Sequence, residues 1–315
     1  MLIKTYAVSI SLLMLNKFIV IQNPLFNMGF FNYYKSYTLY PLQILTILIS
    51  VIILWQKRTN YFLSNTQKYV CLSFLSLGFY NSSFFMALII YLALNSLKDD
   101  QRKQIYYILK KAILINVIIG LYQVLTFKSI GLQTIGEINI ARRIPGLSTI
   151  NAYGYEIIRA YGTMAHPNIL AAYIALLTKW KYALIPNFSV SSAIAQINYF
   201  KPKFSSFIPL ILILIIKNPF LNSTSYIERI NEYSTLYENQ ITHNVFIELF
   251  DHNLFLLIAY SFLNWIIYKK DKQVGVSLFI LAMFDHYLIS HPQGVILIPL
   301  LLNLNIQSEA RIQKK

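Results

Sequence analysis

The chain has 315 residues, of which 56% are hydrophobic and only 12% are charged, and its mean hydropathy is +0.51. Apolar runs recur from one end to the other, which excludes a single soluble core. The formal net charge of +15 is spread over the connections between these runs and forms no basic stripe, so anionic lipid headgroups explain it and no nucleic-acid partner is predicted.

Windows of about 20 residues divide the chain into about ten apolar segments, with a range of roughly eight to ten. In chain order they are Thr5–Gln22, Leu39–Trp55, Phe62–Phe79, Ser83–Leu97, Ile105–Phe127, Pro167–Ile185, Ser205–Lys217, Asn244–Tyr268, Val274–Ser290 and Gly294–Asn305. The third and fourth segments also fit a tight hairpin about Asn81 and Ser82. Backbone groups in lipid must be satisfied within each segment, so these segments are expected to be helices.

We therefore predict an all-α fold: a polytopic membrane helix bundle of roughly 8–10 transmembrane helices, forming a single integral membrane domain over residues 1–315. Lys4 precedes the first segment and no small-residue cleavage site follows it, so this segment is expected to be a retained anchor. Membrane lipids are therefore expected partners of the whole chain.

Lysines and arginines in the short connections predict the orientation. With the N-terminus in the cytoplasm, one side collects Lys57 and Arg58, the run from Lys98 to Lys103, the connection from Lys179 to Lys203, Lys269 to Lys272, and the C-terminal tail. Both termini are therefore predicted to be cytoplasmic. Two larger connections, 128–166 and 218–243, remain as extracytoplasmic loops.

Four arginines lie in these two external loops, against the usual charge bias: Arg142, Arg143, Arg159 and Arg229. A guanidinium is a planar, permanently charged fork that suits phosphate oxygens. The cluster therefore indicates a phosphorylated ligand at the outer membrane face. The alternative is that the arginines pair with loop carboxylates, of which Glu137, Glu156, Glu228 and Glu232 are available.

Histidines gather near the predicted outer helix ends, at His166, His243, His286 and His291. A histidine at a wet interface can act as a general base, although a single one more often only bonds a neighbouring loop. Glu248, Asp251 and His252 are predicted to share a helix face, as a functional site or as a polar network between helices.

A metal site and a cofactor are not predicted. Zinc ligands are conceivable among His243, His252, Asp285 and His286, but no H-E-x-x-H or H-x-H spacing occurs. The single cysteine, Cys71, offers neither a disulfide nor a thiolate cluster.

Three sequence motifs together resemble the O-antigen ligase and polymerase superfamily. Arg159–Asn168 (RAYGTMAHPN) is similar to its R-x-x-G-x-x-x-H-P-N signature, which closes an external loop and opens a helix. His243-Asn244-Val245-Phe246 resembles its H-N-x-aromatic motif, and Asp285-His286-Tyr287 with Gln293-Gly294 resembles the D-H-Y…Q-G ending of a bacterial subgroup. The resemblance covers roughly residues 82–305. The chain is short between the two motif loops, as in a shortened, divergent member.

The resemblance implies a metal-independent, GT-C-like glycosyltransferase of the bacterial cytoplasmic membrane. It would move a glycan from an undecaprenyl-diphosphate carrier to a hydroxyl of a glycan, lipid or protein acceptor. His243 would take the hydroxyl proton, and Arg159 would hold the diphosphate. The substrate-binding set would also include Arg142, Arg143, Arg229, Asp285 and His286, and the structural set His166, Pro167, Asn168 and Asn244.

Three functions stay open on the sequence alone. Ligase and polymerase share these motifs, so the acceptor is not specified. A lipid-linked glycan transporter or flippase would also carry external arginines and intramembrane carboxylates, although no inverted repeat is visible. A non-catalytic, degenerate family member is the third possibility, because the segment between the motif loops is short.

Overall fold

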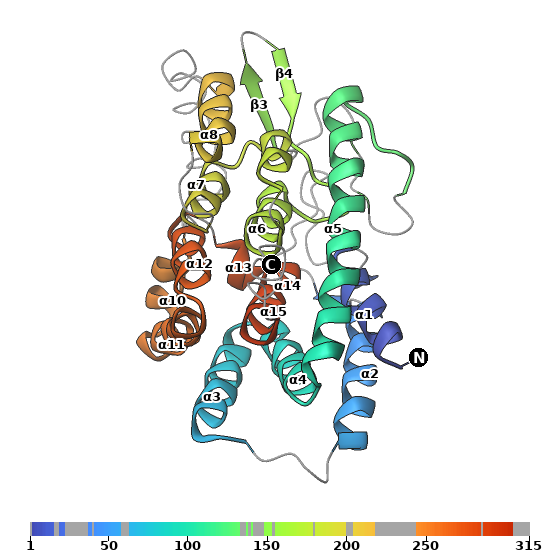
Figure 1. The fold of residues 1–315 in the computed structure, drawn as a ribbon, viewed down its shortest axis with the longest axis vertical. Helices are drawn as coiled ribbons and strands as arrows, with labels where there is room; N and C mark the ends of the chain where they lie inside the picture. The colour runs from blue at the N-terminus through green and yellow to red at the C-terminus, as the bar shows by residue number, and fades with distance from the viewer. Residues whose placement is uncertain are drawn as a thin grey trace, which may run out of the picture.

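The computed structural model describes residues 2–15, 19–22, 37–39, 41–57, 63–132, 137, 140, 148–152, 155–178, 180–199, 204–217, 244–284 and 286–304 (Figure 1). This part of the chain is mainly helical, as predicted. The long helices are α1 (Leu2–Leu12), α2 (Pro41–Lys57), α3 (Asn65–Tyr80), α4 (Ser83–Asn95), α5 (Asp99–Thr126), α6 (Pro167–Leu177), α7 (Val190–Tyr199), α8 (Phe204–Lys217), α11 (Leu254–Lys270) and α12 (Lys272–Phe284). The shorter ones are η3 (Lys181–Asn187), α10 (Val245–His252), α13 (Tyr287–Ser290), α14 (Pro292–Val295) and α15 (Leu297–Asn303).

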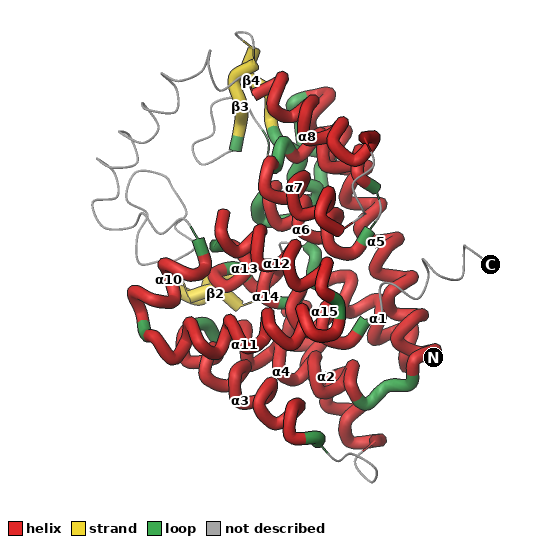
Figure 2. The backbone as a smooth tube through the Cα atoms, turned by 60° about the vertical axis from the view of Figure 1, so that its left-hand side comes forward, coloured by secondary structure: helices red, strands yellow, loops and turns green. Residues whose placement is uncertain are grey.

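Two antiparallel hairpins were not predicted. One pairs β1 (Ile19–Gln22) with β2 (Tyr37–Leu39), so the first apolar segment is a helix only as far as Leu12. The other pairs β3 (Thr149–Ala152) with β4 (Tyr155–Ile158) and projects from the helices beside α8 (Figures 1 and 2).

Helix length decides how many of the expected spans the structure supports. Among the described helices, only α5 is long and apolar enough to cross a membrane, with 28 residues. Shorter apolar helices of 10–17 residues, among them α1, α2, α4 and α6, fall below that length. The described helices are therefore consistent with a helical bundle, but they do not confirm eight to ten membrane spans.

Four predicted segments are interrupted in the structure. The segment 167–185 ends its α-helix at Leu177 and continues as η3, which contains Pro186. The segment 244–268 breaks at Asn253, which closes α10 with its backbone N–H and opens α11 by accepting from the N–H of Phe255. The last segments divide into α12, α13, α14 and α15. Helix α7 lies in a stretch predicted to be a connection.

The helix ends gather in two groups. The first group, which we call the motif end, comprises Met14, Asn81, Thr163, Ser290 and Gln293. Thr163 Oγ1 and Gln293 Nε2 both donate to the Met14 carbonyl, at 3.3 and 2.6 Å, and Asn81 Nδ2 donates to the Ser290 carbonyl at 3.2 Å. These ends are the ones predicted to face outward.

The second group, the basic end, comprises Arg102, Lys270, Leu302 and Asn303. Lys270 Nζ donates to the Leu302 carbonyl at 2.8 Å, and Arg102 Nη1 contacts the Asn303 carbonyl at 3.5 Å. Both cations therefore lie at the C-terminus of α15, where the helix dipole favours positive charge. Burial first, and then the neighbouring Arg102, lowers the pKa of Lys270 to about 8.

Helix α5 exposes apolar side chains on one face and buries several polar ones on the other. Its outer face exposes Leu114, Ile115, Ile118, Leu121, Tyr122 and Leu125. Its inner face buries Asn116, Gly120 and Gln123, at helical spacings of four and three residues. A polar stripe on a buried helix face needs partners, and these come from the loop that follows β4.

Candidate functional site

The loop from Arg159 to His166 lies against the polar stripe of α5. Gln123 Oε1 accepts from the backbone N–H groups of Tyr161 and Gly162, at 3.1 and 2.9 Å, while its Nε2 donates to the Gly162 carbonyl. Asn116 Oδ1 accepts from both the backbone N–H and the hydroxyl of Thr163. Two amides of one helix therefore hold the centre of the first motif.

Glycine is needed at two points of this contact. Gly162 has φ +61°, and a Cβ there would lie 2.6 Å from Asn116 Oδ1 and 2.8 Å from the Asn116 carbonyl oxygen. On the helix side, a Cβ on Gly120 would lie 2.9 Å from Ala160 Cβ. Steric hindrance by Asn116 and the positive φ together explain why the R-x-x-G part of the motif has glycine at position 162.

Arg159 connects three separate segments. Its Nε donates to the Asn187 carbonyl at 2.7 Å, Nη1 to Ser148 Oγ at 3.0 Å, and Nη2 to Asn168 Oδ1. The residue is 9% exposed, so the guanidinium is held as a buried clamp. All three acceptors are neutral oxygens, from two side chains and one backbone carbonyl.

His166 and Pro167 begin α6 as the sequence predicted. His166 is the N-cap, its Nδ1 accepts from the Asn168 N–H at 3.2 Å, and Pro167 occupies the first turn. Burial, followed by the charges of Arg159, His286 and His291, lowers the pKa of His166 well below its usual value. A neutral ring that accepts at Nδ1 fits a structural role.

His291 repeats this arrangement at the start of α14. It caps α14 by accepting from the Gln293 N–H at 3.3 Å, and burial, with a smaller effect of His286, lowers its pKa to about 3. Gln293 then joins the first and third motifs, because its Oε1 accepts from the Ala165 N–H at 2.9 Å. The Tyr173 hydroxyl donates to the Gln293 carbonyl from α6.

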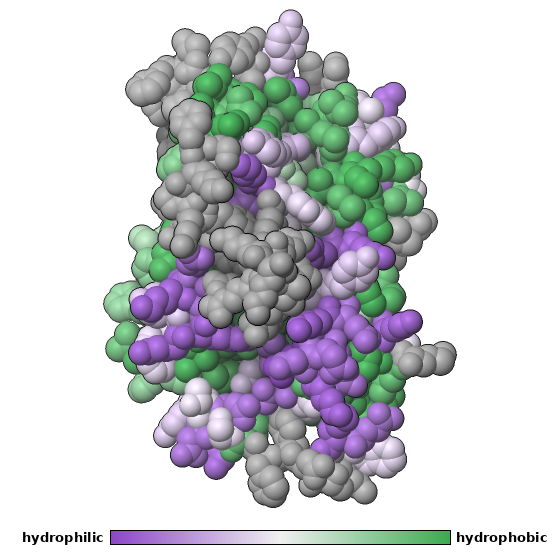
Figure 3. Space-filling view, viewed as in Figure 1, coloured by the Kyte–Doolittle hydropathy of each residue, from purple (hydrophilic) through white to green (hydrophobic). Residues whose placement is uncertain are grey.

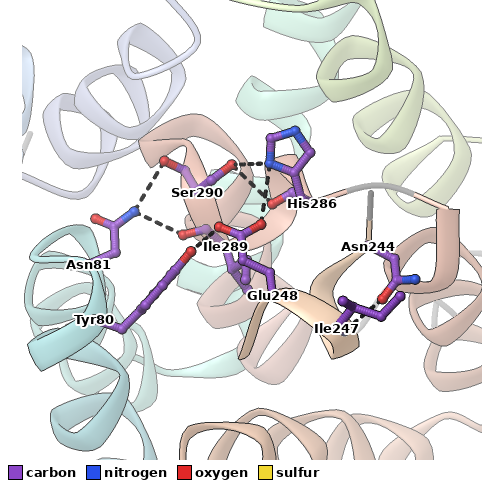
Figure 4. Close-up of polar contacts among 8 residues, drawn as sticks. All are labelled: Tyr80, Asn81, Asn244, Ile247, Glu248, His286, Ile289 and Ser290. Atoms are coloured by element: carbon purple, nitrogen blue, oxygen red, sulfur yellow. Dashed lines mark hydrogen bonds and ion pairs between the residues drawn. The ribbon is translucent and has the colours of Figure 1, made fainter. Parts of the chain in front are cut away.

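A second polar cluster adjoins the first through stacked rings. The Tyr287 ring lies 4.1 Å from that of His166 and 4.4 Å from that of His286, measured between centroids. His286 Nδ1 in turn lies 3.0 Å from Ser290 Oγ and 3.4 Å from Glu248 Oε2 (Figure 4). Glu248 Oε1 accepts a hydrogen bond from the Tyr80 hydroxyl.

Asn244 and Asn81 position the elements that carry this cluster. Asn244 is the N-cap of α10 and accepts from the Ile247 N–H at 2.8 Å, as its structural assignment implies. Asn81, in the turn between α3 and α4, donates to the Ile289 and Ser290 carbonyls of α13 (Figure 4). Sequence analysis missed Tyr80 and Asn81; their only signal was the polar turn at Asn81-Ser82 between two apolar segments.

The structure separates the three ionisable residues of α10. All three lie in this one helix, at the spacing predicted to place them on one side, but Glu248 is buried whereas Asp251 and His252 are exposed. Only the Glu248 carboxylate faces His286. The His252 ring contacts the Tyr80 ring at a centroid distance of 5.0 Å.

Several predicted site residues cannot be placed in this arrangement. His243, Arg142, Arg143, Arg229 and Asp285 lie outside the described residues, as does the whole of the loop 218–243. Arg159, His166, Asn168 and His286 are described, and the contacts above bring them into one continuous cluster.

Glu137 was a possible partner for the loop arginines. Its described hydrogen bonds come from the backbone N–H groups of Ile130, Gly131 and Leu132 and from Gln123 Nε2, at 2.7–3.0 Å. Both carboxylate oxygens of Glu137 therefore accept hydrogen bonds from these donors. One of the donors, Gln123, is also the residue that bonds Gly162.

Comparison with known proteins identifies no relative: no family model, no curated protein and no solved structure matches the chain.

Proposed function

We propose that the chain is a multi-pass membrane glycosyltransferase that moves a glycan from an undecaprenyl-diphosphate carrier to an acceptor hydroxyl. The observation that carries this proposal is the convergence of two motifs more than a hundred residues apart. Ala165 bonds Gln293, and His166 stacks on Tyr287. A buried, positively charged Arg159 lies within the same cluster.

Exposed apolar side chains support the membrane location. Large apolar residues are exposed on α2, α3, α5, α8, α10, α11 and α12, whereas Asn116, Gln123 and Glu248 are buried inside. Figure 3 shows apolar residues over the upper parts of α5 and α8, and hydrophilic ones over the lower part of the same face. Such extensive apolar exposure is unfavourable in water and favourable in lipid.

The two groups of helix ends support several crossings. The motif end contains helix ends predicted to be external, and the basic end contains two connections predicted to be cytoplasmic, 98–103 and 269–272. The connection 179–203, also predicted to be cytoplasmic, instead contacts the external loop, because the Asn187 carbonyl accepts from Arg159. A helix shorter than about 20 residues can still cross when the bilayer thins or flanking lysines extend to the headgroups. Lys269 lies over the Trp265 ring at 5.5 Å, an arrangement typical of a membrane interface.

Thiol labelling of single cysteines tests this topology. In a Cys71→Ser background, we expect a cysteine in place of Tyr155, which is 76% exposed on β4, to react with a membrane-impermeant reagent in intact cells. A cysteine in place of the exposed Asp100 at the start of α5 should react only after permeabilisation. The reverse pattern would invert the orientation and remove the site from the outer face.

The proposed chemistry assigns two tasks to the site. Arg159, with Arg142, Arg143 and Arg229 in support, binds the diphosphate and stabilises the negative charge that grows as it leaves. A histidine takes the proton from the acceptor hydroxyl, and His243, next to the N-cap of α10, is the candidate from the motif. No metal and no cofactor take part, and the acceptor is a glycan, a lipid or a protein.

Glycan transfer in liposomes by the purified full-length protein tests the function. With an undecaprenyl-diphosphate oligosaccharide as donor, we expect wild-type turnover to persist in a chelator and the Arg159→Ala variant to lose it. Movement of intact donor across the bilayer without glycan transfer would instead establish a transporter. Tight donor binding with neither reaction would identify a degenerate, non-catalytic protein.

A further inference from the structure

The Glu248–His286 pair has the geometry of an oriented imidazole. Nδ1 of His286 faces Glu248 Oε2 at 3.4 Å and Ser290 Oγ at 3.0 Å, and the second ring nitrogen points away from both (Figure 4). A carboxylate beside Nδ1 favours the tautomer that carries its hydrogen there. Nε2 then carries the lone pair and can accept a proton.

The two side chains of the pair differ in burial. The Glu248 side chain is 12% exposed, whereas that of His286 is 21% exposed. Among the described residues, Glu248 Oε2 is buried without a hydrogen-bond partner, and Nδ1 of the imidazole lies 3.4 Å from it. A buried carboxylate in that position stabilises the imidazolium that forms when the ring accepts a proton.

Neighbouring helices hold both members of the pair in place. The Tyr80 hydroxyl from α3 bonds the other oxygen of Glu248, and Glu248 lies in the first turns of α10, where the helix dipole favours a negative charge. Asn81 holds the carbonyls of Ile289 and Ser290. Such support from a second layer of residues is typical of sites that need fixed geometry.

The pair also lies next to the proposed diphosphate site. His286 contacts Tyr287, Tyr287 stacks on His166, and His166 adjoins Asn168, which accepts from Arg159. The rings of His166 and Tyr287 therefore lie between His286 and Arg159. Glycosyl transfer from a diphosphate requires both a proton acceptor and a cation that binds the leaving group.

We propose that His286, oriented by Glu248 and Tyr80, is the proton acceptor of this site in place of His243; the inference rests on the proposed glycosyl transfer. The acceptor O–H bond breaks and its proton moves to His286 Nε2 while the oxygen bonds the anomeric carbon. The bond from that carbon to the diphosphate breaks, and its electron pair leaves with the diphosphate. Water later takes the proton from the imidazolium. Glu248 and Tyr80 are positioning residues.

Chemical rescue in the liposome assay tests the assignment. His286→Ala is expected to lower kcat by about 10²–10⁴-fold with little change in KM for the lipid donor. Added imidazole should restore part of the turnover. His286→Asn, which keeps a donor toward Glu248 and Ser290 but lacks a basic nitrogen, should be folded and equally inactive. Glu248→Gln should lower kcat less and should not respond to imidazole.

His252→Ala provides the matched control. His252 lies on the same helix as Glu248 and contacts Tyr80, but it is exposed and does not take part in the contact between Glu248 and His286, so this variant should retain wild-type turnover. If His286→Asn is as active as His252→Ala, or if imidazole rescues His243→Ala and not His286→Ala, the assignment to His286 is wrong while the glycosyltransferase stands. Absence of wild-type turnover would overturn the proposed function, and this assignment with it.

Discussion

Replacement of Arg159 by alanine is expected to abolish glycan transfer and to lower the free energy of unfolding by on the order of 3–5 kcal/mol. The variant removes the charge proposed to bind the diphosphate. It also removes the donors to Asn187, Ser148 and Asn168, which lie on three different segments. Thermal unfolding in detergent and turnover in liposomes measure the two effects separately.

Two further arginine variants separate charge from geometry. Arg159→Lys keeps the charge but cannot reproduce a three-way fork, so we expect it to recover only a small part of the stability and turnover. Arg102→Ala serves as the control, because Arg102 contacts Asp99 and the Asn303 carbonyl at the opposite, basic end. A fully stable Arg159→Ala variant would disprove the clamp, and a fully active one would disprove the diphosphate role.

Replacement of Gly162 by alanine is expected to destabilise the protein by on the order of 2–4 kcal/mol, through a strained backbone and a steric clash together. Its φ of +61° disfavours a side chain, and the new Cβ would meet both oxygens of Asn116 at under 3 Å. Relief of this clash requires the loop to move off α5, which displaces the neighbouring Thr163 and Arg159. Turnover should therefore fall with stability.

Gly131→Ala is the matched control for Gly162→Ala. Gly131 also has a positive φ, +103°, but a Cβ there has nothing within 4 Å. It should show only the cost of backbone strain, about 1–3 kcal/mol, with transfer retained. Equal melting temperatures for the two variants would mean that the contact between Gly162 and Asn116 contributes nothing.

Local signals predicted the helical character and one helix start correctly. Long apolar runs need internally bonded backbone, and His166 before Pro167 marks a first turn, so both features follow from neighbouring residues. The interruptions at Leu177 and Asn253 were not foreseen. A hydropathy window averages over about 20 residues and does not detect one asparagine that caps two helices.

The candidate site was only partly predictable for a different reason. Arg159, His166 and His286 attract notice as polar residues in apolar surroundings. Tyr80 and Asn81 do not, because a tyrosine at a helix end and an asparagine in a turn are ordinary. Their roles depend on contacts with Glu248 and Ser290, more than a hundred residues away.

The amino-acid sequence by itself determined the apolar, mainly helical character of the chain and the helix start at Pro167. These depend on transfer free energies and backbone sterics, which act within a few residues. Only the tertiary structure decided which ionisable groups meet: Glu248 turns inward to His286 while Asp251 and His252 stay outside. Helix packing makes that choice, because it sets which side chains of α10 are buried against the neighbouring helices.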